Sequence, residues 1–243
     1  MTVLSEIDEN FGVFQSRWWE EISTANQANS ANQKLKEAYR ALAAINAVRI
    51  NVSDGVGDAE FFLEAQNDGL ASLVLCQIGM FRASLQSLRS FIESGLNGLY
   101  YKDHPVELAR WKAGSFKTAF SDLTRYFDAH PGVTMLAKKA NPVAVLTGEY
   151  AVLSKAVHGS AKAMWMSGNG QVFLAGEDAA RIGAWNTRFN KVSRAMILLM
   201  VAVYQEKLSG AQQIPSRMTI GLVLSAAQRL AVKEQLKITF PMT

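Results

Sequence analysis

Apolar residues recur at alternating steps of three and four positions along most of this chain, which is the period of an amphipathic α-helix. The pattern is clearest from Asp58 to Tyr101, where one stripe comprises Val74, Ile78, Phe81, Leu85, Leu88, Ile92, Gly95 and Leu99. Extra apolar residues lie off this stripe in the first half of the segment, so we expect that half to be buried on nearly all sides. The segment predicts one long central helix, with residues 67–69 as the alternative place where it divides into two. Gly95 and Gly98 lower helix stability, so we expect another backbone to approach closely there.

Similar stripes predict helices over most of the remaining chain, and the last of them runs from Pro215 to Leu236. Residues 163–174 differ, because two short apolar runs flank the segment from Ser167 to Gly170. The Asn-Gly pair in that segment is a strong signal for the turn of a β-hairpin. Neither an internal repeat nor a low-complexity linker divides the sequence. We therefore predict an all-α fold, a single helical-bundle domain over residues 1–243 with about eight helices and a small β-hairpin near residues 163–174.

Residues 1–24 form an amphipathic segment of their own. The positions that fit one helical face are Phe11, Phe14, Trp18 and Ile22. One interpretation is a helix packed on the body of the protein. The other is a docking arm that binds a partner protein or a second copy through Trp18 and Trp19, because two adjacent tryptophans are hard to bury together on one stripe.

The composition is that of a globular protein, since 49% of the 243 residues are hydrophobic and 19% are charged. The formal net charge of +4 is a mild field over this length, so it permits a nucleic-acid partner without requiring one. The longest apolar run, from Ala195 to Tyr204, is about half the length of a membrane span. The N-terminus is acidic and does not resemble a signal peptide, so we expect a cytoplasmic protein that is not associated with a membrane.

The sequence contains no recognisable motif for a metal or a cofactor. Cys76 is the one cysteine, and the three histidines do not have the His-x-x-x-His spacing of a zinc hydrolase. Neither a phosphate-binding Gly-x-x-x-x-Gly-Lys-Ser/Thr loop nor a Gly-x-Ser-x-Gly elbow is present. We therefore expect no bound metal and no cofactor, and we expect Cys76 to be a small buried apolar residue.

A polar row borders the central stripe and consists of Arg82, Gln86, Arg89 and Glu93. Steps of four, three and four residues place all of them on one side of a helix. One interpretation is a self-satisfied ladder, in which Arg89 pairs with Glu93 and Arg82 with Gln86. The other is a wall that faces phosphate or substrate, because a guanidinium presents fixed donors to phosphate oxygens.

His158 is the histidine with the clearest chemical context. It lies near the end of a helix predicted to start at Asn141, and its side of that helix is polar. The residues that share this side are Ser154, Lys155 and Lys162. A histidine in such a place is a candidate general acid or base. The alternative is a packing histidine whose ring bonds a neighbouring carbonyl.

Two segments carry a family resemblance. The first is Glu149-Tyr-Ala-Val-Leu-Ser-Lys-Ala-Val-His-Gly159, which contains the pattern Tyr-x-x-Leu-Ser-x-x-Val-His. The second is Phe81-Arg-Ala-Ser-Leu-Gln-Ser-Leu-Arg-Ser-Phe-Ile-Glu93, followed by Leu99-Tyr-Tyr101. Over about residues 70–165 the chain resembles helical domains of the HEPN superfamily (higher eukaryotes and prokaryotes nucleotide-binding), and in particular its abortive-infection-like branches.

The resemblance implies a helical protein that acts on RNA. RNA-cleaving members of that superfamily are metal-independent and use an Arg-x(4–6)-His motif, usually at a dimer interface. Bacterial members often belong to phage-defence or toxin–antitoxin systems. The resemblance therefore implies a defence or toxin-type protein with RNA as partner, a homodimer, and a ribonuclease if the site is active.

This chain departs from the superfamily motif at the position that matters. No arginine lies four to six residues before His158, and Lys155 is the nearest basic residue. Arg125 and His130 do have the spacing, but about 0.4 such matches are expected by chance in a chain of this composition. The departure leaves two hypotheses open, an RNA-directed enzyme and a non-catalytic helical subunit.

In the enzyme hypothesis, His158 transfers the proton and Arg82 with Arg89 stabilises the charged phosphate. The substrate-binding residues would be Ser154, Lys155 and Lys162. In the other hypothesis, the protein is a non-catalytic interaction subunit of a multi-protein defence complex that docks through Trp18 and Trp19. If Arg82, Arg89 and His158 converge on one cleft, the enzyme hypothesis is favoured; if they do not, the interaction subunit is favoured.

Overall fold

Two antiparallel helices, α3 (Val56–Gln77) and α4 (Phe81–Asp103), occupy the segment for which one central helix is predicted. The computed structural model describes residues 2–52, 56–168 and 171–241. The chain reverses at residues 78–80, where Gly79 has a φ of +78°, so the prediction of a single helix is wrong. The break also lies beyond residues 67–69. Period alone does not reveal it, because both helices present apolar faces to the same core.

Buried polar contacts join this helical hairpin to a third helix, α9 (Ala179–Val203). The hydroxyls of Ser72 and Ser84 each donate to the other residue's carbonyl, at 2.8 and 2.6 Å. The indole of Trp185 donates to the Ser72 hydroxyl at 3.0 Å. Gly95 faces the Met196 side chain and Gly98 faces the Phe62 ring, so side chains rather than another backbone approach the two glycines.

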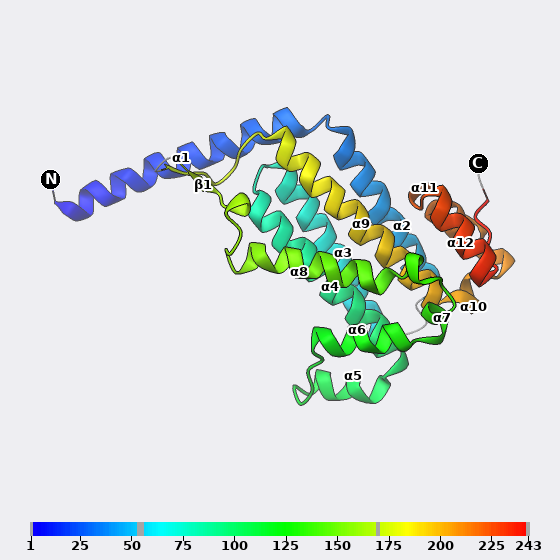
Figure 1. Cartoon of the computed structure of the whole chain (residues 1–243). Helices are drawn as coiled ribbons and strands as arrows, with labels where there is room; N and C mark the ends of the chain where they lie inside the picture. Colours follow the sequence, from blue (N-terminus) through cyan, green and yellow to red (C-terminus); the bar gives the residue numbers. More distant parts are fainter. Residues whose placement is uncertain (1, 53–55, 169–170, 242–243) are drawn as a thin grey trace.

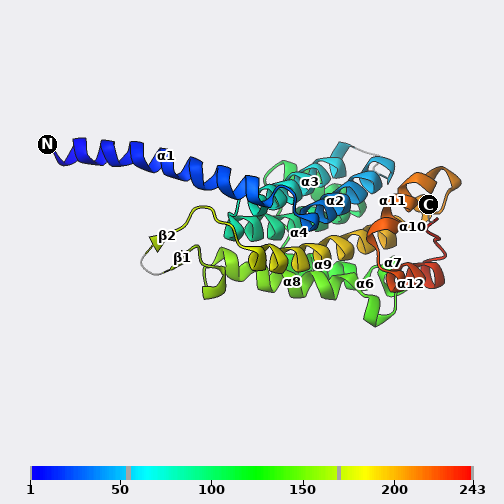
Figure 2. The same cartoon turned by 90° about the horizontal axis from the view of Figure 1, so that it is seen from above.

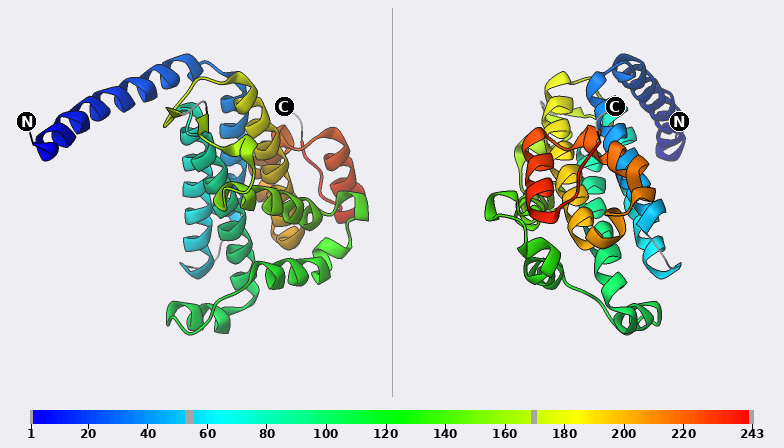
Figure 3. Two further views of the ribbon diagram at one scale, coloured as in Figure 1. Left: turned by 60° about the vertical axis from the view of Figure 1, so that its left-hand side comes forward. Right: turned by 90° about the vertical axis from the view of Figure 1, so that its right-hand side faces the viewer.

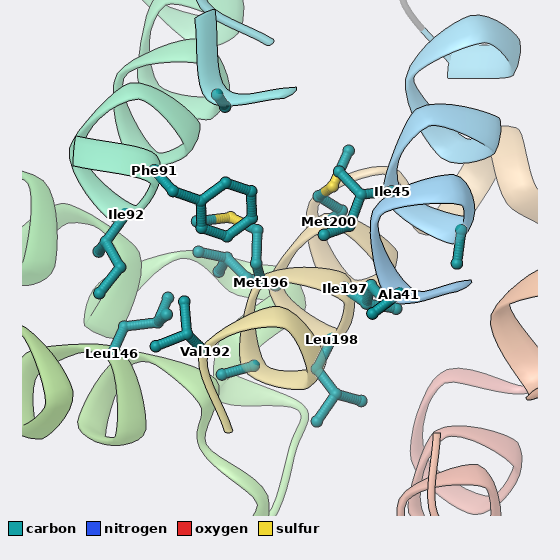
Figure 4. Close-up of a cluster of buried hydrophobic side chains, with 14 of the residues drawn as sticks. Ala41, Ile45, Phe91, Ile92, Leu146, Val192, Met196, Ile197, Leu198 and Met200 are labelled. Carbon is teal, nitrogen blue, oxygen red and sulfur yellow. The ribbon is translucent and has the colours of Figure 1, made fainter. Parts of the chain in front are cut away.

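The segment buried on nearly all sides is the second half of α9 and not the predicted central segment. Every residue from Ala195 to Tyr204 is buried. α2 (Gln33–Val52), α4 and α8 (Pro142–Val157) all pack against α9. Figure 4 shows Met196 and Ile197 among side chains from these neighbours. The longest apolar run of the sequence is therefore the centre of the core.

The all-α prediction is confirmed, but the described residues form twelve α-helices where about eight are predicted (Figure 1). The remaining helices are α1 (Val3–Asn29), α5 (Pro105–Lys112), α6 (Phe120–Ala129), α7 (Pro131–Thr134), α10 (Gln205–Leu208), α11 (Ile214–Val223) and α12 (Ala226–Leu236), with 3₁₀ turns at Lys138–Ala140, Lys162–Met164 and Ala211–Gln213. Two of the extra helices, α7 and α10, have only four residues each. The other two arise because two predicted helices are each divided, one into α3 and α4 and the other into α11 and α12. The last predicted helix divides at Ser225, which caps α12 in a capping box with Gln228.

The strand structure is smaller than the predicted hairpin. β1 (Ser167–Gly168) and β2 (Gln171–Val172) pair antiparallel over two residues each. Lys162–Met164 forms a 3₁₀ turn, so the predicted first strand does not extend through Ala163 and Met164. The predicted turn at Asn169-Gly170 lies outside the described residues.

α1 is one continuous helix that projects from the body, and its direction is visible in Figures 1, 2 and 3. The Thr2 side chain caps its first turn. Its last turns reach the body, where Asn29 donates to the Gln77 carbonyl at 2.9 Å and Gln77 donates to Asn26 at 2.6 Å. Most of the predicted N-terminal helix is therefore not packed on the body, and the first interpretation of residues 1–24 is wrong.

No helix in the described ranges combines the length and apolarity that a membrane crossing requires.

The turn at Gly79 provides a stability test. A Cβ at this position would collide with the backbone of Gly176, and the positive φ would be strained for alanine. We expect Gly79→Ala to lower the free energy of unfolding by about 1–3 kcal/mol, measured by urea denaturation. Gly148→Ala is the control, since nothing lies within 4 Å of that Cβ in α8, and it should raise stability by about 0.5–1 kcal/mol. Equal effects of the two substitutions would contradict this account of the turn.

Candidate functional site

The polar row of α4 faces α8, and its centre is Arg89. The guanidinium of Arg89 donates to Glu93 at 3.0 Å and to the Ser154 hydroxyl at 3.1 Å, and it also donates to the Tyr150 hydroxyl. The Tyr150 hydroxyl in turn donates to Glu93 at 2.7 Å. The predicted Arg89–Glu93 pair is confirmed, and it is part of a closed network across two helices.

Tyr150 is held on both sides of its ring. The Arg89 guanidinium lies 4.4 Å from the ring centroid, and Phe120 stacks on the ring at 3.6 Å. Burial, followed by the hydrogen bond to Glu93, raises the pKa of the Tyr150 hydroxyl to about 12 against the opposing charge of Arg89. A tyrosine that stays protonated at neutral pH acts here as a hydrogen-bonding strut between α4 and α8.

Arg82 closes the end of α8. Its Nε donates to the Ala156 carbonyl at 2.8 Å, and its Nη2 donates to the Val157 carbonyl at 3.3 Å. The last carbonyls of a helix have no intrahelical partner, so this arginine satisfies them and carries a favourable charge at that end. Gln86 donates weakly to the same Ala156 carbonyl at 3.5 Å, so the predicted Arg82–Gln86 pair is replaced by a joint cap of α8.

His158 does not join this network. It is the exposed C-cap residue of α8, and its ring has no hydrogen bond or ion pair to any described residue. Lys155 and Lys162 are also exposed, whereas the Ser154 hydroxyl is half-buried between Arg89 and the Tyr150 carbonyl. The structure therefore brings Arg89 and Ser154 together in one network, whereas Arg82 caps the Val157 carbonyl beside His158 and the His158 residue itself is exposed.

A second polar cluster, which the sequence analysis missed, surrounds Asp103. The Asp103 carboxylate accepts from Lys102 and from the Tyr126 hydroxyl, both at 2.7 Å, and lies 3.6 Å from Nε2 of His130. Burial acts to raise the pKa of Asp103, but the hydrogen bonds from Lys102 and Tyr126, together with the charges of Lys102 and His130, outweigh burial and hold that pKa below its usual range. Burial also lowers the pKa of His130 against the attraction of Asp103. The i,i+4 spacing of Tyr126 and His130 was the available signal.

His130 has no ring nitrogen left for catalysis. Its Nδ1 accepts from the Gly132 amide at 3.1 Å, and its Nε2 faces Asp103. Arg125 pairs with Asp122 at 3.1 Å, and its side chain is 77% exposed. The Arg125–His130 spacing therefore places one residue in solvent and the other in a satisfied network.

The third feature is a cavity of about 680 Å³, hereafter the basic groove, where the starts of α8 and α12 meet the middle of α9. Its lining residues are Lys139, Ala140, Asn141, Pro142, Val145, Thr187, Asn190, Lys191, Arg194, Ala195, Leu198, Ser225, Ala227, Gln228 and Ala231. Three of these residues are basic and none is acidic. None of the predicted site residues lines the basic groove.

The fourth feature is the apolar face of α1, hereafter the α1 stripe, formed by Leu4, Ile7, Phe11, Phe14 and Trp18. Its steps of three and four residues repeat every seven positions, as in helices that pack against another helix. The first four side chains are 67%, 57%, 57% and 47% exposed. Farther along the same face, Ala25 and Asn29 are buried where α1 meets the body.

In comparisons with known proteins, no family model, curated protein or solved structure matches the chain.

The Tyr150 network predicts a dependence of stability on alkaline pH. Because the folded pKa is about 12 and the unfolded value is 10, the unfolded state loses its proton first. The contribution of Tyr150 is therefore fully present below pH 10 and is lost as the pH rises to 12. We expect Tyr150→Phe to lower the free energy of unfolding by about 1 kcal/mol at pH 8, and this difference should shrink above pH 10.

Tyr39→Phe is the control, because Tyr39 is exposed on α2, and it should have no effect on stability at either pH. Urea denaturation at several pH values makes the measurement. A difference between wild type and Tyr150→Phe that does not change with pH would contradict the argument.

Proposed function

We propose that this protein is a non-catalytic helical interaction subunit that docks a partner through α1. The observation that carries the proposal is the exposure of the α1 stripe. Contiguous exposed apolar surface on a protein marks an interaction site, and a helix with anchors at steps of three and four is suited to lying in a groove. Trp18 and Trp19 lie where the stripe nears the body, and their rings meet edge to face with centroids 5.8 Å apart.

The arrangement of the predicted catalytic residues also supports a non-catalytic role. The N–H groups of Arg89 donate hydrogen bonds to Glu93, Tyr150 and Ser154, and Arg82 caps the end of α8. A catalytic arginine has to keep donors for a charged transition state. In this protein both guanidiniums link α4 to α8, which supports an architectural role for them.

A photocrosslinking experiment tests the docking role. A benzophenone amino acid at position 14 should give a covalent adduct with a protein partner in cells, whereas the same group at position 16 should not, since Ser16 faces away from the α1 stripe. Introducing Phe11→Asp should reduce the adduct at least about tenfold, because a buried aromatic anchor contributes about 2 kcal/mol or more.

Ser23→Asp is the matched control for the added charge, since it lies on the opposite face of α1 and should leave the adduct unchanged. Equal adducts from positions 14 and 16, or no effect of Phe11→Asp, would overturn the proposal.

An RNA-directed activity is the second proposal, and the observation that favours it is the exposed cationic end of α8. His158 has a ring free of described partners, with Lys155 and Lys162 also in solvent. In this proposal the protein is a HEPN-like defence or toxin-type ribonuclease, and His158 deprotonates the ribose hydroxyl or protonates the leaving oxygen. Arg82 and Arg89 both bond to α8, so they offer fewer donors to a phosphate, and this makes the RNA-directed activity the weaker of the two proposals.

A cleavage assay on total tRNA and a generic single strand tests the second proposal. Wild type should cleave in the presence of a metal chelator, and His158→Ala should lower the rate by about 10²-fold or more. Arg125→Ala should cleave as wild type does, because Arg125 pairs only with Asp122 among the described residues. Intact RNA at high wild-type concentration, or full activity of His158→Ala, would rule this proposal out.

A further inference from the structure

This inference rests on the proposed docking role of α1 and names the partner. We propose that the α1 stripe of one molecule docks in the basic groove of a second copy of this chain. The proposal joins an exposed apolar helix face to a groove that is lined by small, aliphatic and basic side chains.

The floor of the basic groove suits an apolar helix with aromatic anchors. Small or aliphatic side chains form that floor, among them Pro142, Ala195, Leu198 and Ala231. Small side chains leave space above them, which Phe11 and Phe14 of an incoming helix are large enough to fill. A helix laid in an apolar groove is a recurrent mode of recognition.

Charge selects this groove as the partner surface. Residues 3–29 carry five acidic residues and one basic residue, which gives a net charge of −4. Because the whole chain has a net charge of +4, the remainder of the chain has a net charge of +8. Three of the acidic residues, Glu6, Asp8 and Glu9, lie on the outer half of α1. An acidic helix is therefore attracted to the body of another copy, whereas two acidic helices side by side repel each other.

The basic groove is positive for two reasons. Its basic lining residues are Lys139, Lys191 and Arg194. Of these, Lys191 also forms an ion pair with Glu149, with 3.3 Å between Nζ and Oε1. Arg194 donates its Nε to the Val223 carbonyl at 3.1 Å, which leaves its terminal nitrogens without a described partner. The N-termini of α8 and α12, capped by Asn141 and Ser225, add partial positive charge at the same place.

The α1 stripe cannot occupy the basic groove of its own molecule. Figures 1 and 2 show α1 leaving the body at the end opposite to α12 and pointing away from it. α1 is one continuous helix of 27 residues, about 40 Å long, and its whole projecting length extends away from the groove. The contact is therefore between molecules, and because the two surfaces differ it is head-to-tail, so repetition gives a ring or a filament.

Acidic substitutions that spare the fold provide the test. Val145→Asp and Ala227→Asp together place two negative charges in the basic groove, both in the N-terminal turns of helices where acidic residues are favourable. The matched control is Ala144→Asp with Ala226→Asp, which changes neighbouring exposed positions that do not line the groove. Phe11→Asp with Phe14→Asp is the variant of the α1 stripe.

Sedimentation velocity over a range of concentrations measures the assembly of each protein. We expect wild type and the control to form dimers and larger species, and we expect the groove variant and the stripe variant each to associate at least about tenfold more weakly. An equimolar mixture of these two variants should form a species of two chains and no larger, because the intact α1 of one fits the intact groove of the other.

The remaining outcomes each overturn a stated claim. If the groove variant assembles like wild type while the stripe variant does not, α1 docks elsewhere, so this inference fails and the docking role of α1 stands. If the stripe variant assembles like wild type, the docking role of α1 in self-assembly fails with it. A wild type that stays monomeric also overturns the inference, and crosslinking from position 14 then decides the proposed function separately.

Discussion

The complete burial of the second half of α9 is the constraint on which the rest of the structure depends. A run of ten apolar residues from Ala195 to Tyr204 is stable in water only if it is covered on all sides. α2, α4 and α8 supply that cover, and each presents an apolar face to α9. The first half of α9 is amphipathic instead, and its polar side carries Arg188, Lys191 and Arg194. Lys191 and Arg194 of this side line the basic groove, together with Ala195 and Leu198 from the buried half.

The helices themselves were predictable because burial on one side imposes a period that the sequence displays. The residues at which helices end were harder to predict from the sequence. The α3–α4 turn needs one residue with positive φ, and Gly79 supplies it, but Ile78 and Phe81 on either side keep the apolar period unbroken. The α11–α12 break did have a local signal, since Ser225 and Gln228 form a capping box. The predicted central helix is wrong because the longest apolar run, Ala195 to Tyr204, indicates full burial better than extra apolar residues beside a stripe do.

The candidate site was predictable only as far as its contacts are local. Arg89 and Glu93 are four residues apart, so their pairing follows from helical geometry. Tyr150 completes the network from another helix, 61 residues along the chain, and no periodicity encodes that meeting. For Arg82 the sequence leaves two roles open, a pair with Gln86 and a contact to phosphate, because a guanidinium suits an anion. The carbonyls at the end of α8 offer the same arginine a partial negative charge, and only the packing of α4 on α8 decides between them.

The anchoring of α1 at one end has a consequence for the helix–coil balance of its free part. Isolated helices of fewer than about 12–15 residues are marginal in water, and longer ones owe most of their stability to packing that this segment lacks. Gly12, near the middle of the free part, lowers the stability of the helix by about 1 kcal/mol relative to alanine. Nucleation, the unfavourable step, is already complete at the root, where Ala25 and Asn29 are fixed. The body thus acts as a template from which helical turns propagate outward, and the fraction of time that those turns persist scales the apparent affinity of the segment for whatever it contacts.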